Sequence, residues 1–290
     1  MAFRLAIIAD IHHGAPVKTK RGDAALPLMD EFARYVSDGD ADMVLDLGDR
    51  ISDIDRDTDL RLEREAAEAF RPIAQPVHHI NGNHDRRFLS VAENADILGQ
   101  ALDHETIDTG DWQILLWRAD SKVHRNGPMP GFELPEADLV WLSQRIRAAT
   151  KPTLVVSHIP VSGHAQTGNH YFENNPQFAT YPQTDRVRAT LAQARVPVVC
   201  LAGHVHWNTV TTVDGIPHIT QQSLTESFTT QGRPAGAMGL IELGERVTWE
   251  VVGDDPFAAT LTPRVPGWTP PLPPFKPPMP DPGRDEPPAR

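Results

Sequence analysis

The pattern that decides the fold lies between Leu47 and Asp85, a stretch that opens with Gly48-Asp49-Arg50 and closes with Gly82-Asn83-His84-Asp85. Each of these two polar fragments comes after a short apolar run, Asp42–Leu47 in the first case and Val77–Ile80 in the second. Runs of this length predict buried strands. The sequence therefore places carboxylate, amide and imidazole side chains just beyond two neighbouring predicted strands.

Three further fragments repeat this arrangement elsewhere in the chain. They are Asp10-Ile11-His12 after the run Phe3–Ala9, Ser157-His158 after Thr153–Val156, and Gly203-His204-Val205-His206 after Val196–Ala202. Parallel α/β sheets place their ligand sites at the carboxyl ends of the strands, so we expect all five fragments to meet at one site. Mixed oxygen and imidazole ligands suit Mn, Fe, Co or Zn, and ligand type alone does not select among these metals.

The remaining segments predict alternating helices and strands, followed by short antiparallel strands. We expect helices at 24–37, 59–70, 135–149 and 185–194, two strands within 105–117, and further strands at 209–213, 238–243 and 247–252. Two long polar segments, 162–182 and 217–234, are expected to be loops that wall a pocket or serve oligomer contacts.

The composition is that of a soluble globular enzyme, with 40% hydrophobic and 23% charged residues in 290. The net charge of -12 argues against stable binding to nucleic acid, because such binding depends on Lys and Arg that neutralise phosphates. The single cysteine, Cys200, excludes an internal disulfide and fits a reducing compartment. Cys200 lies in an apolar run, which favours a buried inert thiol over a nucleophile.

The first residues do not predict a secretion signal. Met1–Ala9 contains one basic residue and a short apolar run, and cleavage here would remove the first metal-binding fragment. No stretch of the sequence approaches the length of a membrane span. We therefore expect a cytoplasmic protein.

The composition changes beyond Asp255. Proline dominates residues 263–290, and few side chains there suit a hydrophobic core. Proline fixes φ and removes a hydrogen-bond donor, so such a segment tends to be extended or disordered. We expect a catalytic domain at residues 1–255 and a tail at 256–290 that packs loosely or reaches a neighbouring subunit.

The order of the five fragments, D-x-H, G-D, G-N-H-D, H and G-H-x-H, resembles that of the calcineurin-like metallophosphoesterase superfamily. Within it, the sequence looks most like the branch of bacterial class III cyclic nucleotide phosphodiesterases, and the resemblance covers roughly the first 250 residues. It implies an α/β fold of four layers, an α/β/β/α sandwich in which two mixed sheets pack face to face.

The resemblance also implies two metal ions and the residues that bind them. The first metal would be bound by Asp10, His12, Asp49 and His206, and the second by Asp49, Asn83, His158 and His204. Asp49 would bridge the two, and a hydroxide between the metals would attack phosphorus in line. His84 would stabilise the transition state and protonate the leaving oxygen, oriented by either Asp85 or Asp53.

Each fragment alone is weak evidence, because isolated D-x-H or G-D pairs are common by chance. Lone histidines are more often core or surface residues than ligands, and we assign that role to His78, His79, His104, His124 and His218. All five fragments in the family's order are strong evidence. A non-catalytic metal-binding scaffold usually lacks several ligands, and this sequence lacks none.

The substrate is less well defined. Purple acid phosphatases carry a tyrosine three residues after the bridging aspartate, where this chain has Ser52. Arg50 is a candidate contact to a substrate phosphate or, equally, a structural ion-pair partner. His13 and His170 are further candidate substrate contacts.

The sequence thus predicts a phosphodiesterase for small soluble diesters of the cyclic nucleotide or glycerophosphodiester type. The alternatives are a phosphomonoesterase or a phospholipase-like hydrolase of head groups, and, outside enzymes, the scaffold. A homo-oligomer would give the proline-rich tail a place to bind.

Overall fold

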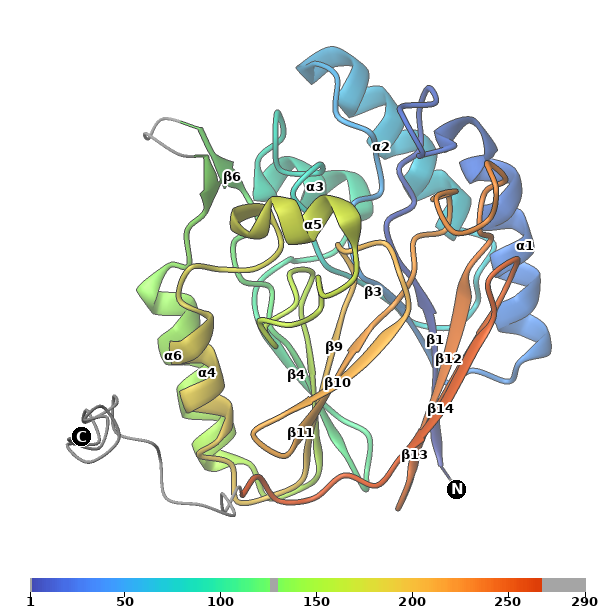
Figure 1. Ribbon diagram of the computed structural model, residues 1–290. Helices are drawn as coiled ribbons and strands as arrows, with labels where there is room; N and C mark the ends of the chain where they lie inside the picture. The colour runs from blue at the N-terminus through green and yellow to red at the C-terminus, as the bar shows by residue number, and fades with distance from the viewer. Residues whose placement is uncertain (1, 126–129, 268–290) are drawn as a thin grey trace, which may run out of the picture.

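The computed structural model describes residues 2–125 and 130–267 and shows two six-stranded sheets packed face to face. Helices cover the outer face of each sheet, so the layers run helix, sheet, sheet, helix (Figure 1). This is the four-layer α/β sandwich with two mixed sheets that the sequence predicted.

The first sheet has the order β14-β13-β12-β1-β2-β3. Its strands are β1 (Phe3–Ile8), β2 (Met43–Asp46), β3 (Val77–His79), β12 (Met238–Leu243), β13 (Val247–Val252) and β14 (Phe257–Leu261). The strands β1, β2 and β3 are parallel, whereas β12, β13 and β14 continue the sheet with antiparallel pairs. The three parallel strands therefore present their carboxyl ends at one edge.

The second sheet has the order β10-β11-β9-β8-β5-β4. Its strands are β4 (Glu105–Asp108), β5 (Gln113–Leu116), β8 (Thr153–Val156), β9 (Val198–Ala202), β10 (Thr209–Val213) and β11 (Ile216–Thr220). The central strands β5, β8, β9 and β11 are parallel, and β4 and β10 pair antiparallel at the two edges.

Six α-helices lie within the described residues: α1 (Ala25–Asp38), α2 (Arg56–Phe70), α3 (Val91–Leu98), α4 (Glu136–Ala148), α5 (His170–Asn174) and α6 (Thr184–Leu191). Short 3₁₀ turns occupy Gly22–Ala24 and Pro176–Phe178, and a two-residue ladder joins β6 (Val123–His124) to β7 (Gly131–Phe132). The start of α2 is fixed by Asp55, whose side chain accepts the backbone N–H of Thr58. Ser90 and Glu93 form a capping box at the start of α3.

Three apolar layers hold the sandwich together. The central layer lies between the sheets and contains Leu5 and Ile7 from β1, Leu154 from β8 and Trp249 from β13. A second layer packs α4 and α6 on the second sheet, and a third packs α1 on the first sheet. Because β5, β8 and β9 are covered on both faces, their sequences are almost continuously apolar and do not alternate.

Four elements differ from the sequence-based expectation. The helix α3 was not predicted, and α5 lies in the segment 162–182 that was expected to be a loop. The strand β11 covers the start of the expected loop 217–234, because its residues are buried between β9 and β10. The expected tail starts too early, since β14 lies beyond residue 256 and pairs with β13 along its length. Residues 268–290 of that tail lie outside the described residues.

Within residues 2–125 and 130–267, no helix is both long and apolar enough to cross a bilayer.

Truncation tests how far the folded domain extends. A chain that ends at Asp255 loses β14, whose Phe257, Ala259 and Leu261 pack against the central apolar layer. We expect its free energy of unfolding to fall by on the order of 2–4 kcal/mol in urea denaturation, because this packing is lost and the edge of β13 is exposed. A chain that ends at Gly267 keeps β14 and is the matched control. Equal stability of the two truncated proteins would show that β14 contributes nothing.

Candidate metal centre

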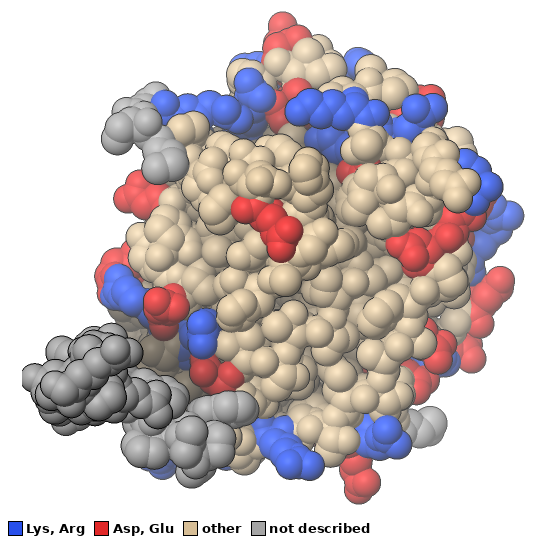
Figure 2. Space-filling view, in the orientation of Figure 1, with Lys and Arg blue, Asp and Glu red and all other residues tan. Residues whose placement is uncertain are grey.

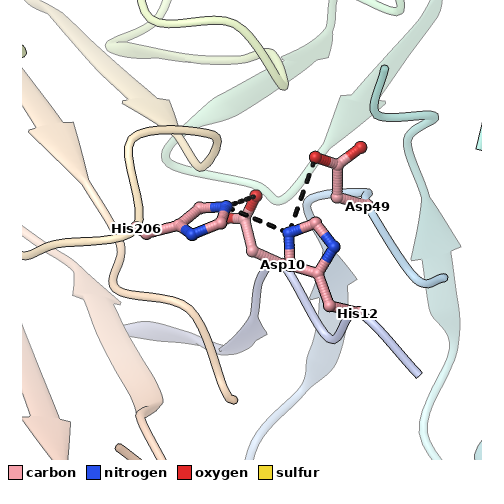
Figure 3. A group of neighbouring side chains, drawn as sticks. All are labelled: Asp10, His12, Asp49 and His206. Atoms are coloured by element: carbon pink, nitrogen blue, oxygen red, sulfur yellow. Dashed lines mark hydrogen bonds and ion pairs between the residues drawn. The ribbon is translucent and has the colours of Figure 1, made fainter. Parts of the chain in front are cut away.

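The five polar fragments converge at the carboxyl ends of strands from both sheets. Asp10 and His12 follow β1, and Asp49 follows β2. His158 follows β8, and His206 belongs to the fragment that follows β9. Figure 3 shows Asp10, His12, Asp49 and His206 pointing toward one another. The sandwich therefore brings together ligands that are up to 196 residues apart (206 minus 10).

One group of candidate ligands consists of Asp10, His12, Asp49 and His206, whose ligand atoms all lie within 4.8 Å of one another. The Nε2 atoms of His12 and His206 are 3.0 Å apart. Asp49 Oδ2 lies 3.8 Å from the first nitrogen, and Asp10 Oδ1 lies 3.5 Å from the second. Two imidazole nitrogens and two carboxylate oxygens thus surround one small volume, as a bound cation requires.

A second group contains Asp49, His158 and His204, again with ligand atoms within 4.8 Å. Asp49 Oδ2 lies 3.5 Å from His158 Nε2, which in turn is 3.3 Å from the amide oxygen of Asn83. Asp49 is the residue common to both groups. Its other oxygen, Oδ1, accepts the backbone N–H of His84 at 2.7 Å, so Oδ2 alone faces both groups.

Five of the candidate ligands have a left-handed backbone conformation. The φ angles are 49° at Asp10, 48° at His12, 56° at Asp49, 72° at His204 and 60° at His206. Non-glycine residues seldom adopt positive φ, and such outliers cluster at functional sites. The tight exits from β1, β2 and β9 are therefore strained in order to direct side chains into the site.

Three histidines each contact an oxygen atom with one ring nitrogen, which directs the other nitrogen into the site. His158 Nδ1 contacts the carbonyl of Leu47 at 2.8 Å, and His206 Nδ1 contacts Glu226 Oε2 at 2.8 Å. His204 Nε2 contacts the carbonyl of Phe178 at 2.6 Å, while its buried Nδ1 has no hydrogen-bond partner among the described residues.

Each of these contacts to an oxygen favours a proton on the outer nitrogen and directs the inner nitrogen into the site. The buried Nδ1 of His204 is therefore available as a metal ligand.

Burial shifts the pKa values of the ligands in different directions. It raises the pKa of Asp10 to about 6 and lowers that of His204 to about 3, so His204 is a neutral donor at physiological pH. Burial would also lower the pKa of His158, but the neighbouring Asp49 carboxylate raises it to about 9. The proton on His158 must therefore leave when a metal binds.

Glu226 is a member of the site that the sequence analysis missed. Its carboxylate is almost fully buried and contacts His206 Nδ1, and this pairing lowers its pKa to about 2 although burial opposes the shift. Glu226 lies in the polar segment after β11, with no apolar run directly before it. No local signal in the sequence identifies it.

His84 lies beside the ligand groups without belonging to either. Its Nε2 is 4.0 Å from Asp49 Oδ2, and its Nδ1 contacts the carboxylate of Asp53. Asp53 is also held by Arg87, at 2.6 Å. Of the two orienting residues that the sequence allowed, Asp53 is thus the one in contact with the imidazole.

Asp85 instead organises the backbone of the site. Its carboxylate accepts the N–H groups of Asp49, Arg50 and Gly82 at 2.8–2.9 Å. Gly82 approaches Asp49 so closely that a Cβ there would lie 2.1 Å from Asp49 Oδ1. Only glycine therefore fits the first position of the G-N-H-D fragment.

The substrate contact predicted for Arg50 is corrected by the structure. The guanidinium is fully buried and donates to Glu63 at 2.6 Å and to Asp46 at 2.9 Å. It also donates to Asn81 and lies 3.3 Å from Asp85. A side chain enclosed by these partners cannot reach a substrate, so the alternative role as a structural ion-pair partner applies.

The other two candidate substrate contacts stay predictions. His13 is partly buried and its Nε2 lies 2.7 Å from Glu65 on α2. His170 is exposed at the start of α5, whose N-terminus is capped by Asn169. Within the described residues, the histidines assigned to core or surface (His78, His79, His104, His124 and His218) lie outside both ligand groups.

A buried pair of ligand groups on this sandwich defines a metallophosphoesterase. The sequence model of the calcineurin-like phosphoesterase family matches residues 3–208, and the chain belongs to that family. Both ligand groups lie within the matched residues, because His206 is the last of them.

Individual relatives are more distant. The chain is 30% identical over 181 residues to the 3',5'-cyclic adenosine monophosphate phosphodiesterase CpdA of Pseudomonas aeruginosa, a match that covers 55% of this chain and 61% of that protein. The structure is similar to a dimetal phosphatase from Danio rerio, with a TM-score of 0.72, 17% identity, and 90% and 98% of the two chains covered. It also resembles a purple acid phosphatase from yellow lupin, with a TM-score of 0.64, 12% identity, and coverage of 90% and 54%. These structural matches show the shared fold.

Arg50→Met tests the ion-pair cluster beneath the site. The substitution leaves three buried carboxylates, Asp46, Glu63 and Asp85, without their common partner. We expect a loss of about 3–5 kcal/mol in the free energy of unfolding, measured by urea denaturation, because unpaired buried charges are costly.

Arg61→Met is the control, since Arg61 is exposed on α2 and, within residues 2–125 and 130–267, pairs only with Glu65. It should leave the denaturation midpoint nearly unchanged. A stable Arg50→Met protein would contradict the structural role of Arg50.

Asp49→Asn tests the sharing of one carboxylate between the two groups. We expect the variant to bind fewer than two metal ions per chain after dialysis against Mn²⁺, measured by inductively coupled plasma mass spectrometry. His84→Ala removes a neighbouring side chain that belongs to neither group and should retain the wild-type metal content. If Asn at position 49 left the metal content unchanged, Asp49 would not join the two sites.

Proposed function

We propose that this protein is a dinuclear metal-dependent phosphodiesterase that hydrolyses small soluble phosphodiesters, of the cyclic nucleotide or glycerophosphodiester type. The observation that carries the proposal is Asp49, whose Oδ2 faces both buried ligand groups. Two metals that share a ligand lie close enough to act on one phosphate. The two ions would be Mn, Fe, Co or Zn, and ligand type does not select among them.

The first ion would be bound by Asp10, His12, Asp49 and His206, and the second by Asp49, Asn83, His158 and His204. When bound, such a pair polarises the phosphoryl group and supplies a nucleophilic oxygen at neutral pH. The outer contacts of His158, His204 and His206 orient the rings so that their inner nitrogens are directed at the metals.

His84 performs the acid–base work in the proposed reaction. Asp53 orients the imidazole through Nδ1, so Nε2 is directed to the region beside Asp49. From there His84 can stabilise charge on the phosphoryl group and donate a proton to the leaving oxygen.

Three observations support a small diester as substrate. The relative from Pseudomonas aeruginosa is named for cyclic nucleotide phosphodiester hydrolysis. Ser52, which stands where purple acid phosphatases have tyrosine, is buried and donates to the carbonyl of His12. The segment 162–182 packs Phe172 against His204, with ring centroids 5.2 Å apart, so part of this segment lies beside the candidate ligands.

Positive side chains lie near the edge of the sheets that holds the site, although the net charge is negative. Figure 2 shows Lys and Arg side chains along the upper edge of the molecule, with Asp and Glu side chains among them. The carboxyl ends of the parallel strands point to this edge (Figure 1).

We also propose that the protein is cytoplasmic and that it forms a homo-oligomer.

Paired aryl phosphates test the proposal. The metal-stripped protein, reloaded with Mn²⁺, should hydrolyse bis(4-nitrophenyl) phosphate faster than 4-nitrophenyl phosphate, measured as kcat/KM at equal pH. The reverse preference would assign a phosphomonoesterase on the same metal centre. Absence of turnover with two metals bound would support a non-catalytic scaffold. Asp49→Asn, reloaded in the same way, is the negative control for contaminating phosphatase.

A further inference from the structure

Lys20 lies at the metal centre, although the residues directly before it are exposed. It belongs to a tight turn in which Val17 and Lys20 exchange two backbone hydrogen bonds of 3.0 Å. The turn is attached to the segment that holds Glu226: Lys20 and Glu226 form an antiparallel bridge, and the N–H of Arg21 donates to Thr225 at 2.9 Å. The backbone of Lys20 is therefore fixed on both sides.

The ammonium group points into the site. Lys20 Nζ lies 3.4 Å from Nε2 of His84 and 3.5 Å from Nδ1 of His12. The carboxylates of Asp49 and Asp53 attract it. These carboxylates already have other partners, because Asp49 faces both ligand groups and Asp53 contacts His84 and Arg87.

Metal binding would weaken the attraction between Lys20 and the site. Two cations in the ligand groups would neutralise Asp49, and Asp53, which belongs to neither group, already contacts His84 and Arg87. His12, bound through Nε2, would carry a proton on Nδ1, and two donors cannot hydrogen-bond to each other. A lysine in this position then needs an anionic acceptor.

The position of His84 indicates where such an acceptor would lie. Asp53 holds the proton on His84 Nδ1, so Nε2 faces Lys20 and the centre of the site. When His84 is protonated on Nε2 as well, an oxygen atom at about 2.8 Å can accept from both Nε2 and Lys20 Nζ, since these nitrogens are 3.4 Å apart. A phosphoryl oxygen meets this requirement and carries the negative charge.

We propose that Lys20 is a catalytic residue that binds a phosphoryl oxygen of the substrate together with His84. This role rests on the proposed phosphoesterase function and adds a contact from a loop that precedes α1. The turn at Val17–Lys20 positions this cationic side chain beside the candidate metal ligands.

Inorganic phosphate provides a test that does not require turnover. Wild-type and Lys20→Met proteins are loaded with Mn²⁺, and phosphate binding is measured by isothermal titration calorimetry. We expect Lys20→Met to bind phosphate about 10- to 100-fold more weakly, the contribution of one charge-assisted hydrogen bond. Its metal content should equal that of the wild type, and its kcat/KM for the aryl diester should fall at least as much as its phosphate affinity.

Lys18→Met is the matched control, since Lys18 lies on the same turn, is exposed, and loses the same charge. It should bind phosphate as the wild type does. Lys20→Arg keeps a cation and should retain more affinity than Lys20→Met, which also covers the case in which the methionine variant does not fold.

Two results would overturn the role of Lys20: unchanged phosphate affinity in Lys20→Met, or loss of metal from that variant. The second would mean that Lys20 only supports His12. Failure of the proposed function gives a different pattern. The wild type would then bind metals and phosphate but hydrolyse neither ester, and Lys20→Met would still bind phosphate more weakly.

Discussion

The single interaction on which the site depends is the placement of the Asp49 carboxylate between two groups of ligands. Its Oδ1 is occupied by the N–H of His84, and its Oδ2 faces His12 on one side and His158 on the other. The residue adopts a φ of 56°, a conformation that the isolated chain would avoid. The surrounding structure must therefore supply enough stabilisation to hold this carboxylate in place.

Much of that stabilisation comes from the layer directly beneath Asp49. Asp85 accepts the N–H groups of Asp49, Arg50 and Gly82, which fixes the exits of β2 and β3 against each other. Arg50 then neutralises Asp85 and neighbouring buried acids. Burial raises the pKa of Glu63 to about 8, although Arg50 opposes the rise, so this cluster is costly to bury. The rigid cluster holds the backbone of Asp49 in its strained conformation.

The sequence could predict the parts of this arrangement that depend on local patterns. Short apolar runs identified the strands that deliver Asp10, Asp49 and His158, because buried parallel strands are continuously apolar. The sequence could not decide the role of Arg50, since an arginine next to a candidate metal ligand can contact a substrate phosphate or form a structural ion pair. It also missed β11 and β14, whose pairing depends on β9 and β13 and not on their own composition.

The residues that surround the ligands were beyond local prediction for a different reason. Glu226 and Lys20 come from loops with no periodic pattern, and they are 206 residues apart (226 minus 20). A backbone bridge between them places one behind His206 and the other beside His84. The carboxylate and the ammonium group are thus fixed by the same contact between loops. A change that displaces the backbone of either loop would therefore move both side chains, whereas a substitution of the Lys20 side chain alone leaves the bridge intact.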